Sequence, residues 1–173
     1  MTSNQRREKI LEMLKESRDP LSAAAIAGNF QVSRQLIVGD IALLRAAGEE
    51  IAATPRGYVM ARRESGGIRR TIACRHTSEE MGEELYTIVD NGGAVLDVIV
   101  EHAVYGQISG QLHIFSRYDV NQFLEKVSRE QVSPLSRLTD GIHLHTILCQ
   151  DEAAYQRVLG ALQKKHLLFE KNR

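Results

Sequence analysis

Two histidines separated by one residue are the side chains with the clearest chemical potential in the chain. His143 and His145 stand in the alternating stretch 141–148, Gly-Ile-His-Leu-His-Thr-Ile-Leu. Alternate side chains of a β-strand share a face and lie about 6.5–7 Å apart along the backbone, so both imidazoles could reach one metal ion. The stretch also fits a strand whose outer face carries two polar rings. The apolar side chains that point the other way are then Ile142, Leu144 and Leu148.

Two further groups are candidates to join this pair. Glu84 lies at the margin of the apolar stripe of a predicted helix, and a half-buried carboxylate needs a partner. His76 precedes that helix by a few residues and could reach Glu84 by folding back over its first turns. Three imidazoles and one carboxylate suit zinc or another late first-row divalent ion. The spacing by itself is no zinc signature, because only the fold could bring the groups together.

Composition narrows the class of protein. With 173 residues, 43% hydrophobic and 25% charged, the chain has room for one medium or two small globular domains. It shows no apolar run that could span a bilayer and no leader, which predicts a cytoplasmic protein. Cys74 and Cys149 lack CxxC spacing, which indicates two buried thiols rather than a disulfide framework. Residues 1–65 carry a net charge of +2 and residues 66–173 a net charge of −2, which permits DNA binding by the first part.

The elements expected in residues 1–61 follow the order of a winged helix-turn-helix domain. Apolar periodicity and capping residues predict three helices, over 5–16, 23–29 and 34–47. A hairpin over 51–60 follows, with its tight turn at Pro55-Arg56-Gly57. In this plan the third helix enters the major groove of DNA. The alternative is a small helical domain that packs on a partner protein.

The third helix supplies the expected base contacts. The side chains at its start are Ser33, Arg34, Gln35 and Val38. Arginine can read guanine and glutamine can read adenine through paired hydrogen bonds, and valine can touch a thymine methyl group. We expect Arg56, at the hairpin tip, to reach the backbone or the minor groove, and Arg6 to meet a phosphate. The predicted partner is therefore double-stranded DNA.

A polar, glycine-containing linker is predicted over 62–67, followed by a second domain over 68–173. Its predicted strands are 68–74, 94–100, 111–114, 135–138 and 141–148, and its predicted helices are 78–90, 118–128 and 151–163. The last two strands are expected to form a hairpin across Asp140-Gly141, and the tail 166–169 is a candidate for a return to the sheet. This order predicts an α+β open sandwich, an antiparallel sheet with helices on one face.

The ordered motifs resemble known repressors. Residues 5–61, with Pro20-Leu21-Ser22, Val32-Ser33-Arg34-Gln35 and Arg56-Gly57-Tyr58, look like the winged-helix domains of bacterial repressors such as the biotin repressor. The second domain adds Cys74-Arg75-His76-Thr77, the stretches 84–93 and 97–106, and His143-Leu144-His145. With these motifs, essentially the whole chain resembles the NiaR type of nicotinate-responsive repressor, whose second domain is the three-histidine, or 3H, domain.

The resemblance implies a homodimeric repressor of genes for NAD-precursor biosynthesis or uptake, with operator DNA as partner and nicotinic acid as corepressor. It implies a phosphocarrier-like open sandwich and a zinc or nickel ion. The implied metal ligands are His76, Glu84, His143 and His145. A pyridine carboxylate could bind the metal through its carboxylate or ring nitrogen. The candidate ligand-binding residues beside it are Arg75, His102 and Tyr105.

Three other functions stay open on the sequence. A repressor of the same build could sense another small molecule or the metal itself. A metal-dependent hydrolytic enzyme could use the ion to activate water, although no further carboxylate or nucleophile with a convincing base is present in the sequence. A protein-interaction module would not need Arg34 and Gln35 for any contact with DNA.

Overall fold

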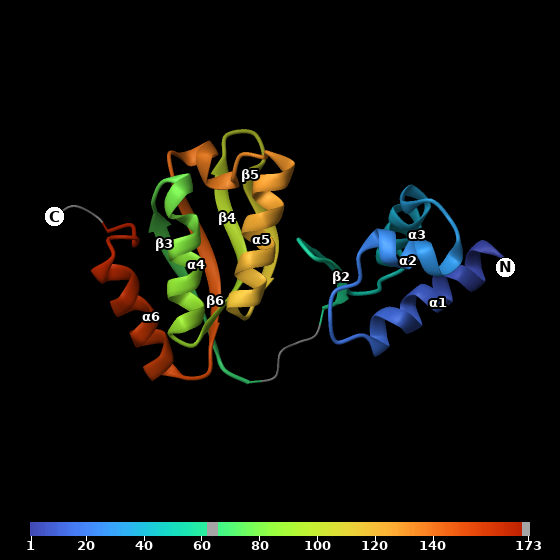
Figure 1. The fold of residues 1–173 in the computed structure, drawn as a ribbon, viewed down its shortest axis with the longest axis horizontal. Helices are drawn as coiled ribbons and strands as arrows, with labels where there is room; N and C mark the ends of the chain where they lie inside the picture. Colours follow the sequence, from blue (N-terminus) through green and yellow to red (C-terminus); the bar gives the residue numbers. More distant parts are fainter. Residues whose placement is uncertain (62–65, 171–173) are drawn as a thin grey trace. The chain divides into compact units, whose positions relative to one another are not determined.

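The computed structural model describes residues 1–61 and 66–170, and the chain divides into two compact units, Met1–Glu64 and Ser65–Arg173 (Figure 1). Each unit has a hydrophobic core of its own. Most of the predicted linker, residues 62–65, lies outside the described residues. Among the helices described, none has the length and apolar character needed to cross a membrane.

The first unit contains three helices and a two-stranded hairpin, as the sequence predicted. Their bounds are α1 Ser3–Glu16, α2 Ala23–Phe30, α3 Arg34–Ala46, β1 Ile51–Thr54 and β2 Gly57–Met60. Each helix begins where a hydroxyl side chain can accept a hydrogen bond from a free backbone N–H group. These capping residues are Thr2, Ser22 and Ser33. Capping by Ser22 and Ser33 therefore accounts for the correctly predicted starts of α2 and α3, whereas the Thr2 cap starts α1 two residues before the predicted position.

A close backbone approach ties the hairpin to the segment before α2. The backbone N–H groups of Leu21 and Tyr58 each donate to the carbonyl of the other residue, at 2.8 Å. Gly57 has a φ of +139°, and a Cβ atom there would lie 2.4 Å from the Leu21 carbonyl oxygen. Only glycine fits this position without a shift of the backbone. The hairpin is thus held against the segment before α2 by a close contact that requires glycine at position 57.

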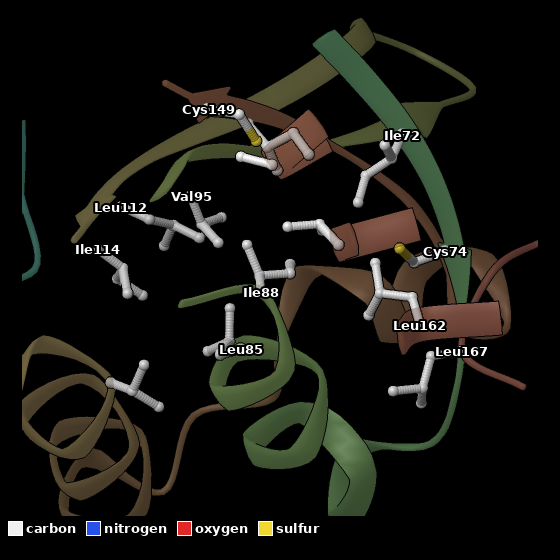
Figure 2. Close-up of a cluster of buried hydrophobic side chains, with 14 residues drawn as sticks. Ile72, Cys74, Leu85, Ile88, Val95, Leu112, Ile114, Cys149, Leu162 and Leu167 are labelled. Atoms are coloured by element: carbon white, nitrogen blue, oxygen red, sulfur yellow. The ribbon is translucent and has the colours of Figure 1, made fainter. Parts of the chain in front are cut away.

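The second unit is a four-stranded antiparallel sheet with its helices on one face. The bounds are β3 Ile68–Arg75, α4 Met81–Asp90, β4 Gly93–His102, β5 Gly106–Ile114, α5 Arg117–Glu130, β6 Ile142–Cys149 and α6 Glu152–Lys164, with 3-10 helices at Ser78–Glu80 and Leu135–Thr139. The strand order is β3-β6-β4-β5. Figure 2 shows side chains of the sheet, such as Ile72 and Val95, meeting Leu85 and Ile88 of α4. The predicted mixed α+β fold is confirmed.

The predicted strand over 135–138 is wrong, because these residues form the 3-10 helix Leu135–Thr139. β6 already pairs with β3 along one edge and with β4 along the other, so it has no free edge for a hairpin partner. Asp140 and Gly141 do make a turn, with φ values of 50° and 85°, but the turn closes on the helix through a bond from Gly141 N–H to the Ser136 carbonyl. The sequence showed the turn and not the strand pairing.

The chain end does return to the sheet, as expected. Leu168 forms a β-bridge with Cys74, and the N–H group of Phe169 donates to the Ala73 carbonyl. Leu167, just before these residues, is buried in the core, and its carbonyl accepts a hydrogen bond from the Arg75 N–H group. The chain end therefore covers the outer edge of β3 beside Ala73 and Cys74.

Candidate metal centre and nucleic-acid interface

Strand β6 directs both histidines inward. Its side chains alternate between half-buried and buried, and His143 and His145 share the buried face with Ile147 and Cys149. The interpretation of an outer face carrying two polar rings is therefore wrong. The face that lacks helices carries the half-buried apolar residues of the strand, Ile142, Leu144 and Leu148. Two imidazoles in a helix-covered core need polar partners.

The partner of all three histidine side chains is Glu84. It extends from the first turn of α4, and its side chain is only 1% exposed. The Nε2 atoms of His76 and His145 lie 2.6 Å and 3.3 Å from its Oε2 atom, and Nε2 of His143 lies 3.1 Å from Oε1. The structure thus brings together the four groups that the sequence singled out.

A backbone carbonyl fixes the outer nitrogen of each ring. The Nδ1 atoms of the three rings lie 2.6–2.8 Å from the carbonyl oxygens of Thr77, Gly141 and Asp97. A carbonyl can only accept, so each Nδ1 atom carries a hydrogen. The three Nε2 atoms then face one another and the carboxylate. Carbonyls that accept a hydrogen bond from the outer ring nitrogen are typical of metal-ligating histidines. The donor set of three nitrogens and one carboxylate fits zinc or nickel.

The electrostatics of the cluster also favour a cation. Burial opposes the charge of Glu84, but the charge of His145 and the hydrogen bonds from the imidazoles outweigh it and hold the pKa of this carboxyl well below its usual range. Burial lowers the pKa of His76 and His145, and the bond and charge of Glu84 reverse this and raise both values. Without a metal, His76 and His145 therefore keep a proton at higher pH than an ordinary imidazole does. A divalent ion could take the place of those protons.

Cys74, for which the sequence predicted only a buried thiol, is a further potential donor. It lies directly opposite His143 in the pairing of β3 with β6, and its side chain is fully buried. Burial, with the charge and a hydrogen bond of Glu84, raises the pKa of this thiol. The ligand atoms of Cys74, Glu84 and His143 all lie within 4.8 Å of one another. The signal in the sequence was the i, i+2 spacing of Cys74 and His76.

A cleft of about 750 Å³ opens beside His76. Arg75 lines it, as expected of a ligand-binding residue, together with Arg137 from the 3-10 helix Leu135–Thr139, which the sequence analysis had not singled out. Of the described residues, His102 and Tyr105 are not part of this lining. They form a local pair in the hairpin between β4 and β5, with ring centroids 5.1 Å apart. The structure therefore does not bring these two candidates to Arg75.

The start of α3 presents a polar and apolar surface suited to DNA. Arg34 and Gln35 are exposed, and Ser33 uses its hydroxyl to cap the helix at the N–H group of Leu36. Val38 is half-buried against the helical core. Gly39 is exposed as well, and a Cβ atom added there would meet nothing within 4 Å. Packing inside the unit thus gives no reason for a glycine in mid-helix, whereas a close approach of a DNA backbone would.

Arg6 has a role other than the predicted phosphate contact. Its side chain is buried, and Nε lies 2.6 Å from Oδ2 of Asp40 on the inner side of α3. A second guanidinium nitrogen lies 3.3 Å from Oδ1 of the same carboxylate, and Arg7 approaches that oxygen as well. The paired guanidinium joins α1 to α3, so we no longer assign Arg6 to the DNA interface. Arg56 lies in the turn between β1 and β2, where the sequence placed it.

This buried ion pair predicts a strong effect on stability. Replacing Asp40 with alanine leaves the Arg6 guanidinium buried without its partner, and breaking such a pair costs about 3–5 kcal/mol. Hydrogen exchange of the α1 and α3 amides in the full chain should speed up accordingly. The double variant Arg6→Met, Asp40→Leu should recover most of the protection, since no buried charge is left without a partner. Arg7 also loses its contact with Asp40, but its side chain is 24% exposed and can be solvated. Equal loss of protection in both variants would argue against this role for the pair.

Comparison with known proteins gives the same two-part organisation. Residues 6–59 match the model of an HTH domain, and residues 69–171 match the model of the 3H domain. The chain is 45% identical over 166 residues to "Probable transcription repressor NiaR" of Thermotoga maritima, covering 96% of this chain and 94% of the relative. It is 40% identical over 168 residues to "Transcription repressor NadR" of Bacillus subtilis, covering 95% of this chain and 93% of the relative.

Proposed function

The chain belongs to the NiaR-type family of DNA-binding transcription repressors of NAD-related genes, and from this premise we propose that nicotinic acid is its corepressor. We propose further that one zinc or nickel ion occupies the buried cluster and that the ligand binds at or beside it. The proposed metal ligands are His76, Glu84, His143 and His145. The observation that supports the metal is the convergence of three Nε2 atoms on one buried carboxylate, in rings whose Nδ1 atoms are held by backbone carbonyls.

The cleft beside His76 is lined by Glu79, Glu80 and Asp140 as well as by two arginines, and the arginines are the groups that could bind a negatively charged ligand. Arg75 and Arg137 both line it, and guanidinium groups bind carboxylates through paired, charge-assisted hydrogen bonds. The ion, when bound, would act as a Lewis acid to which a pyridine nitrogen or a carboxylate can bind. In this arrangement His76 belongs to both the cluster and the cleft, so it is the residue through which ligand and metal occupancy affect each other. Nicotinamide, which lacks the carboxylate, should bind less well.

Control of DNA binding would follow from a shift between conformations of a homodimer. We propose that α3 enters the major groove with Arg34 and Gln35 at base edges and that the hairpin with Arg56 reaches the backbone or minor groove. Two such helices must lie about 34–36 Å apart to meet successive turns of one DNA face. Ligand and metal that bind this arrangement better than others increase its population. Coupling of this kind typically amounts to about 5–150-fold in affinity.

A titration of operator DNA tests the proposal. Fluorescence anisotropy with a labelled fragment from upstream of an NAD-precursor gene is measured with and without zinc or nickel, and with nicotinic acid or nicotinamide. We expect the tighter binding, within the 5–150-fold range typical of such coupling, only when metal and nicotinic acid are both present. Operator affinity that nicotinic acid does not change, with metal present, would refute the corepressor role. The full effect with metal alone would instead favour a metal sensor.

A further inference from the structure

The buried cluster has a fifth donor beside it. β3 carries Cys74 and ends at Arg75, His76 follows directly after the strand, and β6 carries His143 and His145 at i, i+2. The pairing of the two strands sets Cys74 directly across from His143. Side chains at i, i+2 on a strand share a face. His143 and His145 therefore share one face of β6, Cys74 lies across from His143 on β3, and Glu84 of α4 contacts His76 as well as both histidines of β6.

Cys74 and Cys149 are both buried on the covered face of the sheet, but they differ in their distance from the histidines. Figure 2 shows the Cys74 sulfur directed from β3 into this face, near Leu162 and Leu167. Cys149 is equally buried on the same face, but it pairs with Ile68 and Gly93, away from the histidines. Only the Cys74 sulfur, of these two, lies within 4.8 Å of both a Glu84 carboxylate oxygen and a His143 ring nitrogen. Cys149 is therefore a matched control for any effect of the Cys74 sulfur.

We propose that the Cys74 thiolate is a direct ligand of the metal ion and makes the site prefer thiophilic ions over hard ones. This inference rests on the metal site of the proposed function. When the ion binds, the Sγ–H bond breaks, the proton leaves to solvent, and a sulfur lone pair forms the bond to the metal. Thiolate and imidazole together suit zinc, nickel and cobalt, whereas manganese and magnesium prefer oxygen ligands.

X-ray absorption of the zinc-loaded, full-length wild type tests the bond without any substitution. Zinc–sulfur bonds are about 2.3 Å long and zinc–nitrogen bonds about 2.0–2.1 Å, so the two shells can be separated. We expect one sulfur neighbour per zinc ion among nitrogen and oxygen neighbours. A shell of nitrogen and oxygen alone would overturn the inference and leave the proposed metal site intact. Failure of the protein to bind zinc would overturn both.

Paired cysteine variants test the same bond through cobalt(II). Sulfur-to-cobalt charge transfer absorbs in the near ultraviolet, and we expect this band in the wild type and in Cys149→Ser but not in Cys74→Ser. Equilibrium dialysis shows whether cobalt is bound in each case. For Cys74→Ser we expect zinc affinity to fall by about tenfold or more. Tenfold is the smallest loss typical when a residue that only orients a metal ligand is removed. Manganese affinity should stay unchanged. A band that survives in Cys74→Ser would overturn the proposal, and if this variant does not fold, the absorption result on the wild type decides.

Discussion

Replacing His143 and His145 together with alanine is expected to abolish metal binding and, with it, the effect of nicotinic acid on operator affinity. The change removes two of the three imidazole nitrogens that face Glu84, leaving only His76, the carboxylate and the proposed thiolate of Cys74. Loss of a group that only hydrogen-bonds to a metal ligand lowers metal affinity by about 10–100-fold, so loss of two direct ligands should lower it by more than about 100-fold. Equilibrium dialysis with zinc and operator anisotropy measure the two effects.

The winged helix should be untouched by this double substitution. Its core is formed within the first unit, so basal operator affinity without metal should equal that of the metal-free wild type. His166→Asn is a matched control, because His166 is exposed and its φ of 58° suits asparagine. Zinc bound at full stoichiometry by the double variant would place the metal elsewhere. Normal regulation by nicotinic acid in a variant that binds no zinc would separate ligand sensing from the metal.

Replacing Arg34 and Gln35 together with alanine is expected to remove specific operator binding. Each paired contact to a base edge is worth about 1–3 kcal/mol of discrimination, so the two together should cost at least roughly 30-fold in affinity. Both side chains are exposed at the start of α3, and alanine is a good helix former, so the helix should persist. Anisotropy titrations with operator and with scrambled DNA at one salt concentration measure the loss.

A charge-matched control separates base contacts from electrostatics. Gln122→Ala with Arg129→Ala removes the same two side-chain types from exposed positions of α5 in the second unit. It should leave operator affinity close to that of the wild type. If instead the Arg34 and Gln35 variant bound the operator as tightly as the control, these two side chains would not make the proposed base contacts, which is the result that the protein-interaction alternative predicts.

Local chemistry made the first unit predictable. Hydroxyl caps, apolar periodicity and one turn specify its helices and hairpin within the segment itself, and the observed bounds of α2 and α3 lie within one residue of those expected. The second unit depends on pairings between distant strands. The alternation of residues 141–148 showed that His143 and His145 share a face, but the choice of face depends on where α4, α5 and α6 pack.

The phosphate contact predicted for Arg6 conflicts with a signal elsewhere in the sequence. Its partner Asp40 lies on the apolar stripe of α3 between Ile37 and Ile41. A carboxylate on a buried stripe requires a cation. The same argument, applied to Glu84, correctly led to a buried cluster with His76. Applied to Asp40, it would have predicted a buried arginine instead of a phosphate contact.

The most direct test of the account is a crystal structure of the zinc- or nickel-loaded protein with nicotinic acid, with data collected at the absorption edge of the metal. We predict one anomalous peak per chain, bonded to the Nε2 atoms of His76, His143 and His145 and to a carboxylate oxygen of Glu84, with nicotinic acid at or beside the ion. A peak at other residues, or none from protein that retains one zinc or nickel ion per chain, would contradict the central claim.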